Sequence, residues 1–415
     1  MPYIPRDLEE TLEKYKHRGE IIAIQGPRQA GKTTLLKHIY EKRSEPKAFV
    51  NLDLPEERRA LSKNPFTFLR RHLPEERGTL FLDEVQNVEN AGTSLKIIYD
   101  TFPDVKIFVS GSSSLKMRKD VATALVGRML SFDLLTFNFH EFLRARDEGL
   151  ARIHKDYRKA TVRAIRKGAD LPESEYQEEF HQHLQEYLRY GGYPAVVLEK
   201  DEEVRRKILS EIIATYVEQD VTAYFGVEHT DKFMDFLKVL ARATGTVVSI
   251  SSLADAARIA YKTAERFLSI LEQSYIVKRV RPHHDNIVTE IRKAPKIYFM
   301  DVGIRNAILR NFLPLESRTD AGQLLENFIF REILTNISEG VKYWRTKTGA
   351  EVDFVLTVND ELIPIEVKVS GKPSRGFYSF IRAYKPERAF VVTLGESKVE
   401  KRGETKIYYV PAWFL

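Results

Sequence analysis

The hydrophobic positions of the first 138 residues predict buried strands that alternate with helices. Short apolar runs bounded by polar or turn-forming residues are typical of strands covered on both faces. Five runs fit this description: Ile21–Gln25, Ala48–Leu52, Leu80–Leu82, Lys106–Val109 and Leu130–Leu134. Thr34–Tyr40 has helical spacing instead. We therefore expect residues 1–138 to form an α/β domain with a mostly parallel sheet.

A helical pattern rich in charge replaces these strands in residues 139–230. We expect this segment to form a helical lid beside the ligand site of the preceding domain. Gly191–Pro194 interrupts the helices, and its two glycines suit either a hinge or a packing turn. We favour the packing turn.

The order of predicted elements in residues 231–312 is typical of a winged helix. Three helices are expected, at Asp231–Ala243, Leu253–Ala260 and Tyr261–Gln273, followed by strands at Tyr275–Arg281 and Lys296–Phe299. Apolar residues of the third helix recur at i, i+3, i+4 and i+7, which indicates one core-facing stripe.

The last segment, residues 313–415, predicts a further α/β domain. Its elements come in the order helix, three strands, helix, strand. They are Ala321–Ser338, Val341–Arg345, Glu351–Leu356, Leu362–Lys368, Ser374–Tyr384 and Ala389–Leu394.

A glycine-rich loop joins the first predicted strand to the first helix. It reads Gly26-Pro27-Arg28-Gln29-Ala30-Gly31-Lys32-Thr33 and fits G-x-x-x-x-G-K-[ST]. Its glycines let backbone N–H groups point at phosphates, its lysine adds a cation, and its threonine offers a hydroxyl to Mg²⁺. We expect these eight residues and Thr34 to bind ATP.

Two acids end the third predicted strand and indicate hydrolysis. Asp83 is expected to hold Mg²⁺, and Glu84 to polarise the attacking water. After the next strand, Ser110 or Ser112 is expected to orient that water, and spacing does not choose between them. Arg128 is the best candidate for the arginine that holds charge on the transferred phosphate, although a surface arginine fits equally well.

Composition narrows the possible chemistry and location. The 415 residues include no cysteine, which excludes disulfides, zinc–thiolate sites and thiol catalysis. No apolar run approaches the ~18 residues that cross a bilayer, and the first residues lack the apolar core of a signal peptide, so we expect a cytoplasmic protein without a membrane partner. The abundance of Glu, Lys and Arg is typical of thermophiles.

The positive charge is concentrated in the segment expected to be a winged helix. Residues 231–312 hold 14 Lys and Arg against 8 Asp and Glu, a surplus equal to the +6 of the whole chain. Polar residues on the third helix suit DNA phosphates and base edges, and a basic loop between the strands suits the DNA backbone. The DNA-binding residues expected are Lys262, Arg266, Gln273, Arg281, Arg292 and Lys293. A winged helix used only for packing or oligomer contacts stays open.

Acidic residues form a second constellation in the last domain. Glu366 and Lys368 lie on one face of a predicted strand, beside Asp353 if the two strands pair, and Glu326 can join them from the preceding helix. The three carboxylates suit Mg²⁺ or Mn²⁺, and the lysine suits activation of a water for attack on a phosphodiester. An ion-paired sheet face without catalysis is the alternative.

Taken together, these segments resemble a widespread prokaryotic, especially archaeal, family of AAA+ P-loop ATPases that carry a winged helix and a C-terminal domain similar to PD-(D/E)xK nucleases. The resemblance is carried by the glycine loop, Asp83 and Glu84, the serines after Val109, Gly127–Arg128, Gly191–Pro194, and the blocks around Asp353 and Glu366. It implies a restriction-endonuclease-like last domain in which Asp353, Glu366 and Lys368 match metal and catalytic positions. The aspartate lacks the preceding proline.

We therefore expect a Mg²⁺-dependent ATPase coupled to DNA binding and DNA processing, with a nuclease tail. The alternative is an ATP-dependent switch whose nuclease-like domain is non-catalytic and binds DNA or a protein. A nucleotide-sensing transcription regulator is a third possibility. An arginine supplied across a subunit boundary would require a homo-oligomer.

Overall fold

The computed structural model describes residues 3–111, 123–223, 225–284, 286–337 and 340–415. The chain forms two compact units. One comprises residues up to Thr136 together with Gln273–Tyr275, and the other comprises Phe137–Glu272 and Ile276–Leu415. Within the described residues, no helix is both long and apolar enough to span a bilayer.

The first unit is built on a five-stranded parallel sheet in the order β2-β3-β4-β1-β5. The strands are β1 Ile21–Gln25, β2 Lys47–Asn51, β3 Gly78–Asp83, β4 Val105–Gly111 and β5 Met129–Asp133. This confirms the expected α/β fold with a parallel sheet. All five parallel strands end at one edge of the sheet, where ligands bind in open α/β folds.

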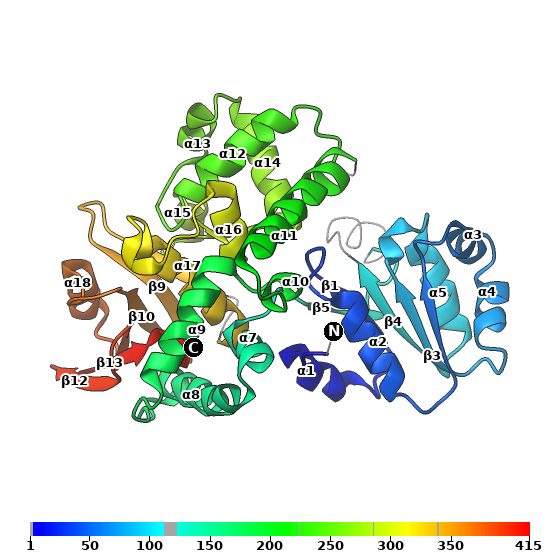
Figure 1. Cartoon of the computed structure of the whole chain (residues 1–415), viewed down its shortest axis with the longest axis horizontal. Coiled ribbons are helices and arrows are strands. Elements are labelled where there is room, and N and C mark those ends of the chain that lie inside the picture. Colours follow the sequence, from blue (N-terminus) through cyan, green and yellow to red (C-terminus); the bar gives the residue numbers. More distant parts are fainter. Residues whose placement is uncertain (1–2, 112–122, 224, 285, 338–339) are drawn as a thin grey trace. The chain divides into compact units, whose positions relative to one another are not determined.

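Helices cover both faces of this sheet because successive strand residues point to opposite sides (Figure 1). On one face, Ile22, Ile24 and Phe108 pack with α1 Asp7–Tyr15 and α2 Lys32–Lys42. On the other, alternate residues of the same strands pack with α3 Pro55–Lys63, α4 Pro65–His72 and α5 Ala91–Thr101.

The second unit begins with a helical segment, as its charge-rich helical pattern predicts. Its helices are α7 Phe139–Arg146, α8 Glu148–Lys167, α9 Gln177–Tyr190, α10 Pro194–Val197 and α11 Glu202–Thr215, followed by the π-helical turn η3 Tyr216–Thr222. Between α9 and α10, a Cβ on Gly192 would lie 2.0 Å from the carbonyl oxygen of Phe137. The glycine pair is therefore a packing turn, because backbone approaches it too closely for any larger residue.

Three helices and a hairpin follow in the expected order. They are α12 Thr230–Arg242, α13 Ile250–Ala256, α14 Tyr261–Gln273, β6 Val277–Val280 and β7 Lys296–Phe299, with an added antiparallel bridge between Val247 and Lys296. Ala264, Phe267, Leu268 and Leu271 of α14 are all buried in one core, as their spacing predicts.

The last part of the chain forms a six-stranded mixed sheet in the order β12-β13-β11-β10-β9-β8. Its strands are β8 Lys342–Arg345, β9 Glu351–Val358, β10 Glu361–Val367, β11 Arg388–Thr393, β12 Lys398–Arg402 and β13 Thr405–Pro411, and its helices are α17 Ala321–Asn336 and α18 Arg375–Tyr384. The preceding helix, α16 Val302–Leu309, packs instead in the core of α12, α13 and α14. Strands β9 and β10 pair antiparallel, which places Asp353 close to Glu366. The hairpin of β12 and β13 was not among the expected elements.

Candidate nucleotide site, cationic surface and acid cluster

The glycine loop adopts a conformation that two of its positions reserve for glycine. Gly26 has a φ of +151°, and a Cβ there would lie 2.0 Å from the carbonyl oxygen of Leu134. Gly31 has a φ of +97° and directly precedes α2, so the loop turns sharply into the helix N-terminus. The backbone thus curls between β1 and α2 as a phosphate-binding loop requires.

Two cations fix this loop from inside the fold. The buried ammonium of Lys32 donates to the carbonyl oxygens of Pro27 at 2.7 Å and Gly26 at 3.1 Å. Arg6, which is also buried, donates to the carbonyl oxygens of Ala30 at 2.8 Å and Leu135 at 2.6 Å. Sequence reasoning missed Arg6 because nothing in its local pattern indicates a contact 24 residues away.

The acids expected to assist hydrolysis lie at the same edge of the sheet as the loop. Asp83 ends β3, is only 4% exposed, and accepts a hydrogen bond from the Ser110 hydroxyl. Burial raises the pKa of Asp83, against the opposing effect of the Ser110 and Thr33 hydroxyls. Thr33 and Asp83, the two residues expected to hold Mg²⁺, thus lie at the same edge of the sheet.

The backbone conformation of Glu84 and its hydrogen bonds with Ser110 and Gln86 fix its orientation. Its φ of +58° is left-handed, its N–H donates to the Ser110 hydroxyl at 3.1 Å, and its carboxylate accepts a hydrogen bond from the Gln86 side chain. The structure thus links Ser110 to both acids. Ser112, the alternative serine, lies outside the described residues.

Arg128 does not complete the nucleotide site of its own chain. It precedes β5, and Met129 pairs with Ile21 at the start of β1, whereas the glycine loop follows the end of β1. The strand length separates these ends by about 13 Å. The guanidinium instead binds Asp100 through Nε at 2.8 Å and Nη2 at 3.3 Å. Parallel register thus places Arg128 at the sheet edge opposite the glycine loop, where its contact with Asp100 fits the alternative of a surface arginine.

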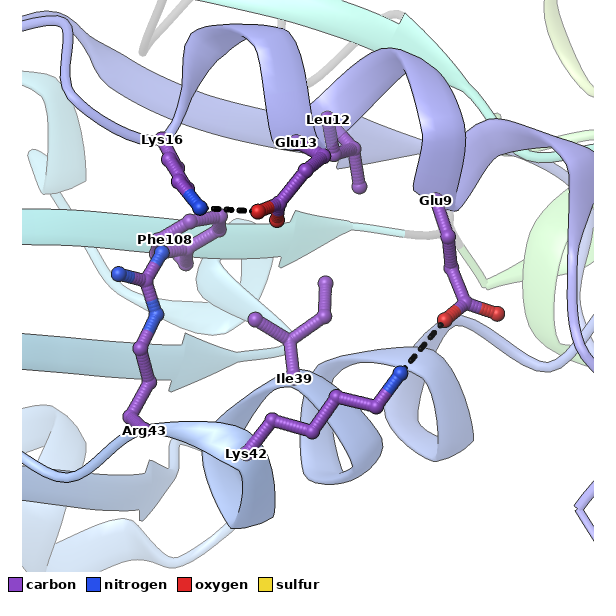
Figure 2. Close-up of a pocket in the computed structure, with 8 residues that line it drawn as sticks. All are labelled: Glu9, Leu12, Glu13, Lys16, Ile39, Lys42, Arg43 and Phe108. Carbon is purple, nitrogen blue, oxygen red and sulfur yellow. Dashed lines mark hydrogen bonds and ion pairs between the residues drawn. The ribbon is translucent and has the colours of Figure 1, made fainter.

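A cavity of about 240 Å³ opens between α1, α2 and β4 in the first unit (Figure 2). Glu9 binds Lys42 at 3.4 Å, Glu13 binds Lys16, and Arg43 lies 5.5 Å from the ring centre of Phe108. None of its lining residues belongs to the glycine loop. We therefore assign it no part in phosphate binding.

A second cavity, of about 430 Å³, lies beside the N-terminal half of α14 and carries an excess of positive charge. Lys232, Arg258 and Arg266 line it, together with Glu228 and His229. Arg266 is held in place by a 2.7 Å hydrogen bond to the carbonyl oxygen of Phe225. Lys262 is exposed on the same helix, whereas Gln273 is half-buried at its last position.

The loop expected to form a basic wing contacts strand β8. Tyr343 of β8 hydrogen-bonds its N–H to the carbonyl oxygen of Arg281 at 3.1 Å and accepts from the N–H of His283 at 2.5 Å. The loop also contains the helix α15 Ile287–Arg292, whose Glu290 binds Lys342 at 2.6 Å. Arg281, Arg292 and Lys293 remain exposed. The backbone of the loop thus pairs with β8, while its basic side chains stay accessible.

Acidic side chains of the last domain gather around a lysine that the sequence did not single out. Lys296 of β7, 1% exposed, places Nζ 2.7 Å from Glu351, 2.9 Å from Glu326 and 3.6 Å from Asp353. The hydroxyl of Tyr298 donates to the same oxygen of Glu326. We call Glu326, Glu351, Asp353 and Glu366 the acid cluster.

Glu366 and Lys368 lie at the other end of the acid cluster. Lys368 Nζ is 2.9 Å from Glu366 Oε1, which also accepts the Ser374 N–H at 3.2 Å. Asp353 Oδ2 accepts the Val367 N–H at 2.8 Å. The structure therefore brings together every residue expected in this constellation and adds Glu351 and Lys296.

The pKa values of Glu326, Glu366 and Lys296 are all raised, although for different reasons. Burial and the charge of Asp353 raise the pKa of Glu326 to about 7, although Lys296 opposes this shift. Burial and Asp353 likewise raise the pKa of Glu366. For Lys296, burial alone lowers the pKa, but the carboxylates of Glu326, Asp353 and Glu351 outweigh it and raise the pKa.

These carboxylates do not fit the divalent ion expected there. Mg²⁺ and Mn²⁺ take about six oxygen ligands. In the acid cluster, lysine ammonium groups already lie within ion-pair distance of all four carboxylates. Across the described parts of the chain, no three Asp, Glu or His side chains are arranged to hold a metal ion.

Comparison with known families divides the chain into three parts. Residues 18–143 match an AAA domain, residues 181–314 match the domain of unknown function DUF8612, and residues 321–415 match the domain of unknown function DUF4143. The first unit therefore contains an AAA-type ATPase domain.

Similar proteins occur in archaea and bacteria. An uncharacterized protein of Methanocaldococcus jannaschii is 25% identical over 87% of this chain and 77% of its own length, and one of Haemophilus influenzae is 24% identical over 86% and 84%. Among solved structures, a Walker-type ATPase of Pyrococcus abyssi is 14% identical, with a TM-score of 0.48 over 74% of this chain and 96% of its own. ORC1 of Aeropyrum pernix, solved in complex with DNA, is 13% identical, with a TM-score of 0.31 over 74% and 94%.

Proposed function

We propose that this protein is a Mg²⁺-dependent ATPase whose turnover is coupled to DNA binding. The observation that carries the proposal is that the glycine loop and Asp83 lie at one edge of the parallel sheet, where β1 and β3 end. A phosphate-binding loop and an acid at one sheet edge are the minimal arrangement for positioning a triphosphate and its metal ion.

Each residue of this site has a distinct role in hydrolysis. Lys32, whose ammonium lies against the loop carbonyls, would bind β- and γ-phosphate oxygens. Thr33 and Asp83 would hold Mg²⁺, which when bound neutralises charge that develops on the phosphates. Glu84 would accept a proton from the attacking water, with Gln86 and Ser110 fixing its position.

DNA binding is assigned to the cationic cavity beside α14. The order of α12, α13, α14 and the hairpin of β6 and β7 supports a winged helix, with α14 as its recognition helix. Lys232 and Arg258 join the expected Arg266 around a concave surface, and the expected Lys262 is exposed on the same helix as Arg266. Such clusters bind nucleic-acid phosphates, and the binding weakens steeply with salt.

The last domain supports a second candidate function, in which ATP drives a switch rather than DNA cleavage. Its strand order and its acids support a nuclease-like fold. The ion pairs of Lys296 and Lys368 occupy the carboxylates that a metal-dependent nuclease would need. We therefore favour a domain that binds DNA or a protein partner without cutting.

Arg128 enters the proposal only across a subunit boundary. Since it lies at the opposite sheet edge from its own glycine loop, it can reach a phosphate only in another copy of the chain. A homo-oligomer is accordingly part of the proposal.

We also propose that the chain divides into an ATPase core at residues 1–138, a helical lid at 139–230, a winged helix at 231–312 and a nuclease-like domain at 313–415.

One experiment tests both halves of the function. ATP turnover is measured with and without duplex DNA, and DNA affinity is measured over a salt series. Glu84→Gln should lower kcat at least about 100-fold while ATP still binds, because only proton transfer is lost. Lys232→Glu combined with Arg258→Glu should weaken DNA binding at least about tenfold, flatten the salt dependence and remove the stimulation by DNA.

Lys238→Glu is the matched control for the DNA arm. Lys238 shares α12 with Lys232 but lies outside the cavity and is exposed. Its reversal should change neither DNA affinity nor turnover. Full turnover in Glu84→Gln would refute the hydrolysis assignment, and unchanged DNA affinity in the double variant would refute DNA docking at α14.

A further inference from the structure

We propose that Lys296 is a resident cation of the acid cluster and excludes a divalent metal ion from it. In this assignment the Lys296 ammonium group neutralises the negative charge of the carboxylates, as a metal ion does in a metal-dependent nuclease. The site then holds the last domain to the β6–β7 hairpin and does not depend on metal.

Strand β7 presents a different face to each of its two neighbours. Ile297 and Phe299 point into the apolar core formed with α12, α13 and α14. Lys296 and Tyr298, two residues apart, point to the other side and both bind Glu326 Oε1. The period of two in a strand thus delivers a cation and a hydroxyl to the same carboxylate.

Helix α17 locks this arrangement from the opposite side. Asn327 accepts from the Phe299 N–H and donates to the Phe299 carbonyl oxygen, both at 2.8 Å. Arg331 donates to the Met300 carbonyl oxygen at 3.1 Å. Because these bonds hold β7 against α17, Lys296 is a built part of the site rather than a surface side chain folded over it.

The oxygens left over are too few for a metal ion. Glu326, Glu351 and Asp353 surround Lys296, and Glu366 Oε1 binds Lys368 and the Ser374 N–H. Glu366 Oε2 is buried without a hydrogen-bond partner, but the other oxygen of this carboxylate already binds the Lys368 ammonium group. A divalent ion would also lie next to two ammonium groups, which repel it.

The inference is independent of ATP hydrolysis and of DNA binding, so it is tested by metal binding alone. Full-length protein without nucleotide is titrated with Mn²⁺, and bound ions per chain are counted by electron paramagnetic resonance. Wild type and Asp353→Asn should bind the same number. Lys296→Met should bind one more ion than wild type, and Lys296→Met combined with Asp353→Asn should lose it again.

Each outcome decides the inference. A wild type that binds one Mn²⁺ more than Asp353→Asn overturns it, because the ion then binds with Lys296 in place. A folded Lys296→Met that gains no ion also overturns it, because Lys296 is then not what excludes the metal. If Lys296→Met fails to fold, the comparison of wild type with Asp353→Asn decides alone. The same comparison distinguishes this result from any failure at the glycine loop, which Asp353 does not touch.

Discussion

Buried cations organise both candidate sites at the scale of single residues. Lys32 and Arg6 bind backbone carbonyl oxygens of the glycine loop, and Lys296 binds the acid cluster. A buried charge is tolerated only where hydrogen bonds or opposite charges compensate its desolvation. The partners of each cation therefore indicate what the fold holds in place.

Arg6 is expected to act as a positioning residue for the glycine loop. Arg6→Met leaves two carbonyl oxygens without their donor, so the free energy of unfolding should fall by about 1–3 kcal/mol. The KM for ATP should rise several-fold because the loop is less well held, whereas kcat changes little. Thermal unfolding and steady-state kinetics measure the two effects.

Arg18→Met is the control for this change, because Arg18 is exposed in the same unit. It should shift stability by no more than about 0.5 kcal/mol. A KM for ATP that is equal in wild type and Arg6→Met would show that Arg6 has only a structural role.

At the scale of elements, close backbone contacts show that the glycine turn between α9 and α10 is a packing turn. The turn between α9 and α10 contacts the Phe137 backbone, and its Gly192 N–H donates to Asp301 at 2.9 Å. Asp301 also accepts the Ile304 N–H at the start of α16. A short glycine turn thus joins three elements that are distant in sequence.

Gly192→Ala should destabilise the protein by about 1–3 kcal/mol, since its Cβ would meet the Phe137 carbonyl oxygen at 2.0 Å. Gly322→Ala is the matched substitution, because no atom lies within 4 Å of the added Cβ at the start of α17. It should leave stability unchanged or raise it by less than about 1 kcal/mol. Urea unfolding of both variants measures the difference. Equal effects would disprove the packing role of the turn.

At the scale of the whole molecule, a buried ionic group joins helices α16 and α17 in the second unit. Asp320 binds Arg305 of α16 at 2.8 Å and Arg318 at 2.8 Å. Arg305 also donates to the Ala241 carbonyl oxygen of α12 at 3.1 Å. Helices of the segments 231–312 and 313–415, which the sequence predicts to be separate, therefore share one network.

The pH dependence of stability should report this network. Burial raises the pKa of Asp320, but hydrogen bonds from Arg318 and the charge of Arg305 outweigh it and lower the pKa from 3.8 to about 2. The folded state therefore binds the proton of the Asp320 carboxyl more weakly than the unfolded state does. The contribution of ionised Asp320 to the free energy of unfolding is complete above about pH 4 and is lost as pH falls toward about pH 2.

Asp320→Asn should lower the free energy of unfolding at neutral pH. It should also make that free energy fall less between about pH 4 and pH 2 than it does in the wild type. Urea unfolding across this range measures both effects. Asp170→Asn, at an exposed aspartate, is the control and should leave the curve unchanged. A curve for Asp320→Asn that runs parallel to the wild type would exclude Asp320 as a source of the pH dependence.

The sequence by itself determined the elements whose signal is local. The five strands of the parallel sheet, the glycine loop, Asp83 with Glu84, and the core stripe of α14 all follow from spacing and residue type over a few positions. Burial of alternate or helical positions is a short-range pattern, so it can be read along the chain.

Tertiary structure alone decided which distant residues meet. It placed Arg6 under the glycine loop, moved Arg128 to the far sheet edge, paired the expected wing with β8, and brought Lys296 into the acid cluster. Parallel register and strand pairing set these contacts over tens to hundreds of residues, and no local pattern encodes them. Sequence therefore indicated the acids at Glu326 and Asp353, but only the fold revealed that Lys296 forms ion pairs with them.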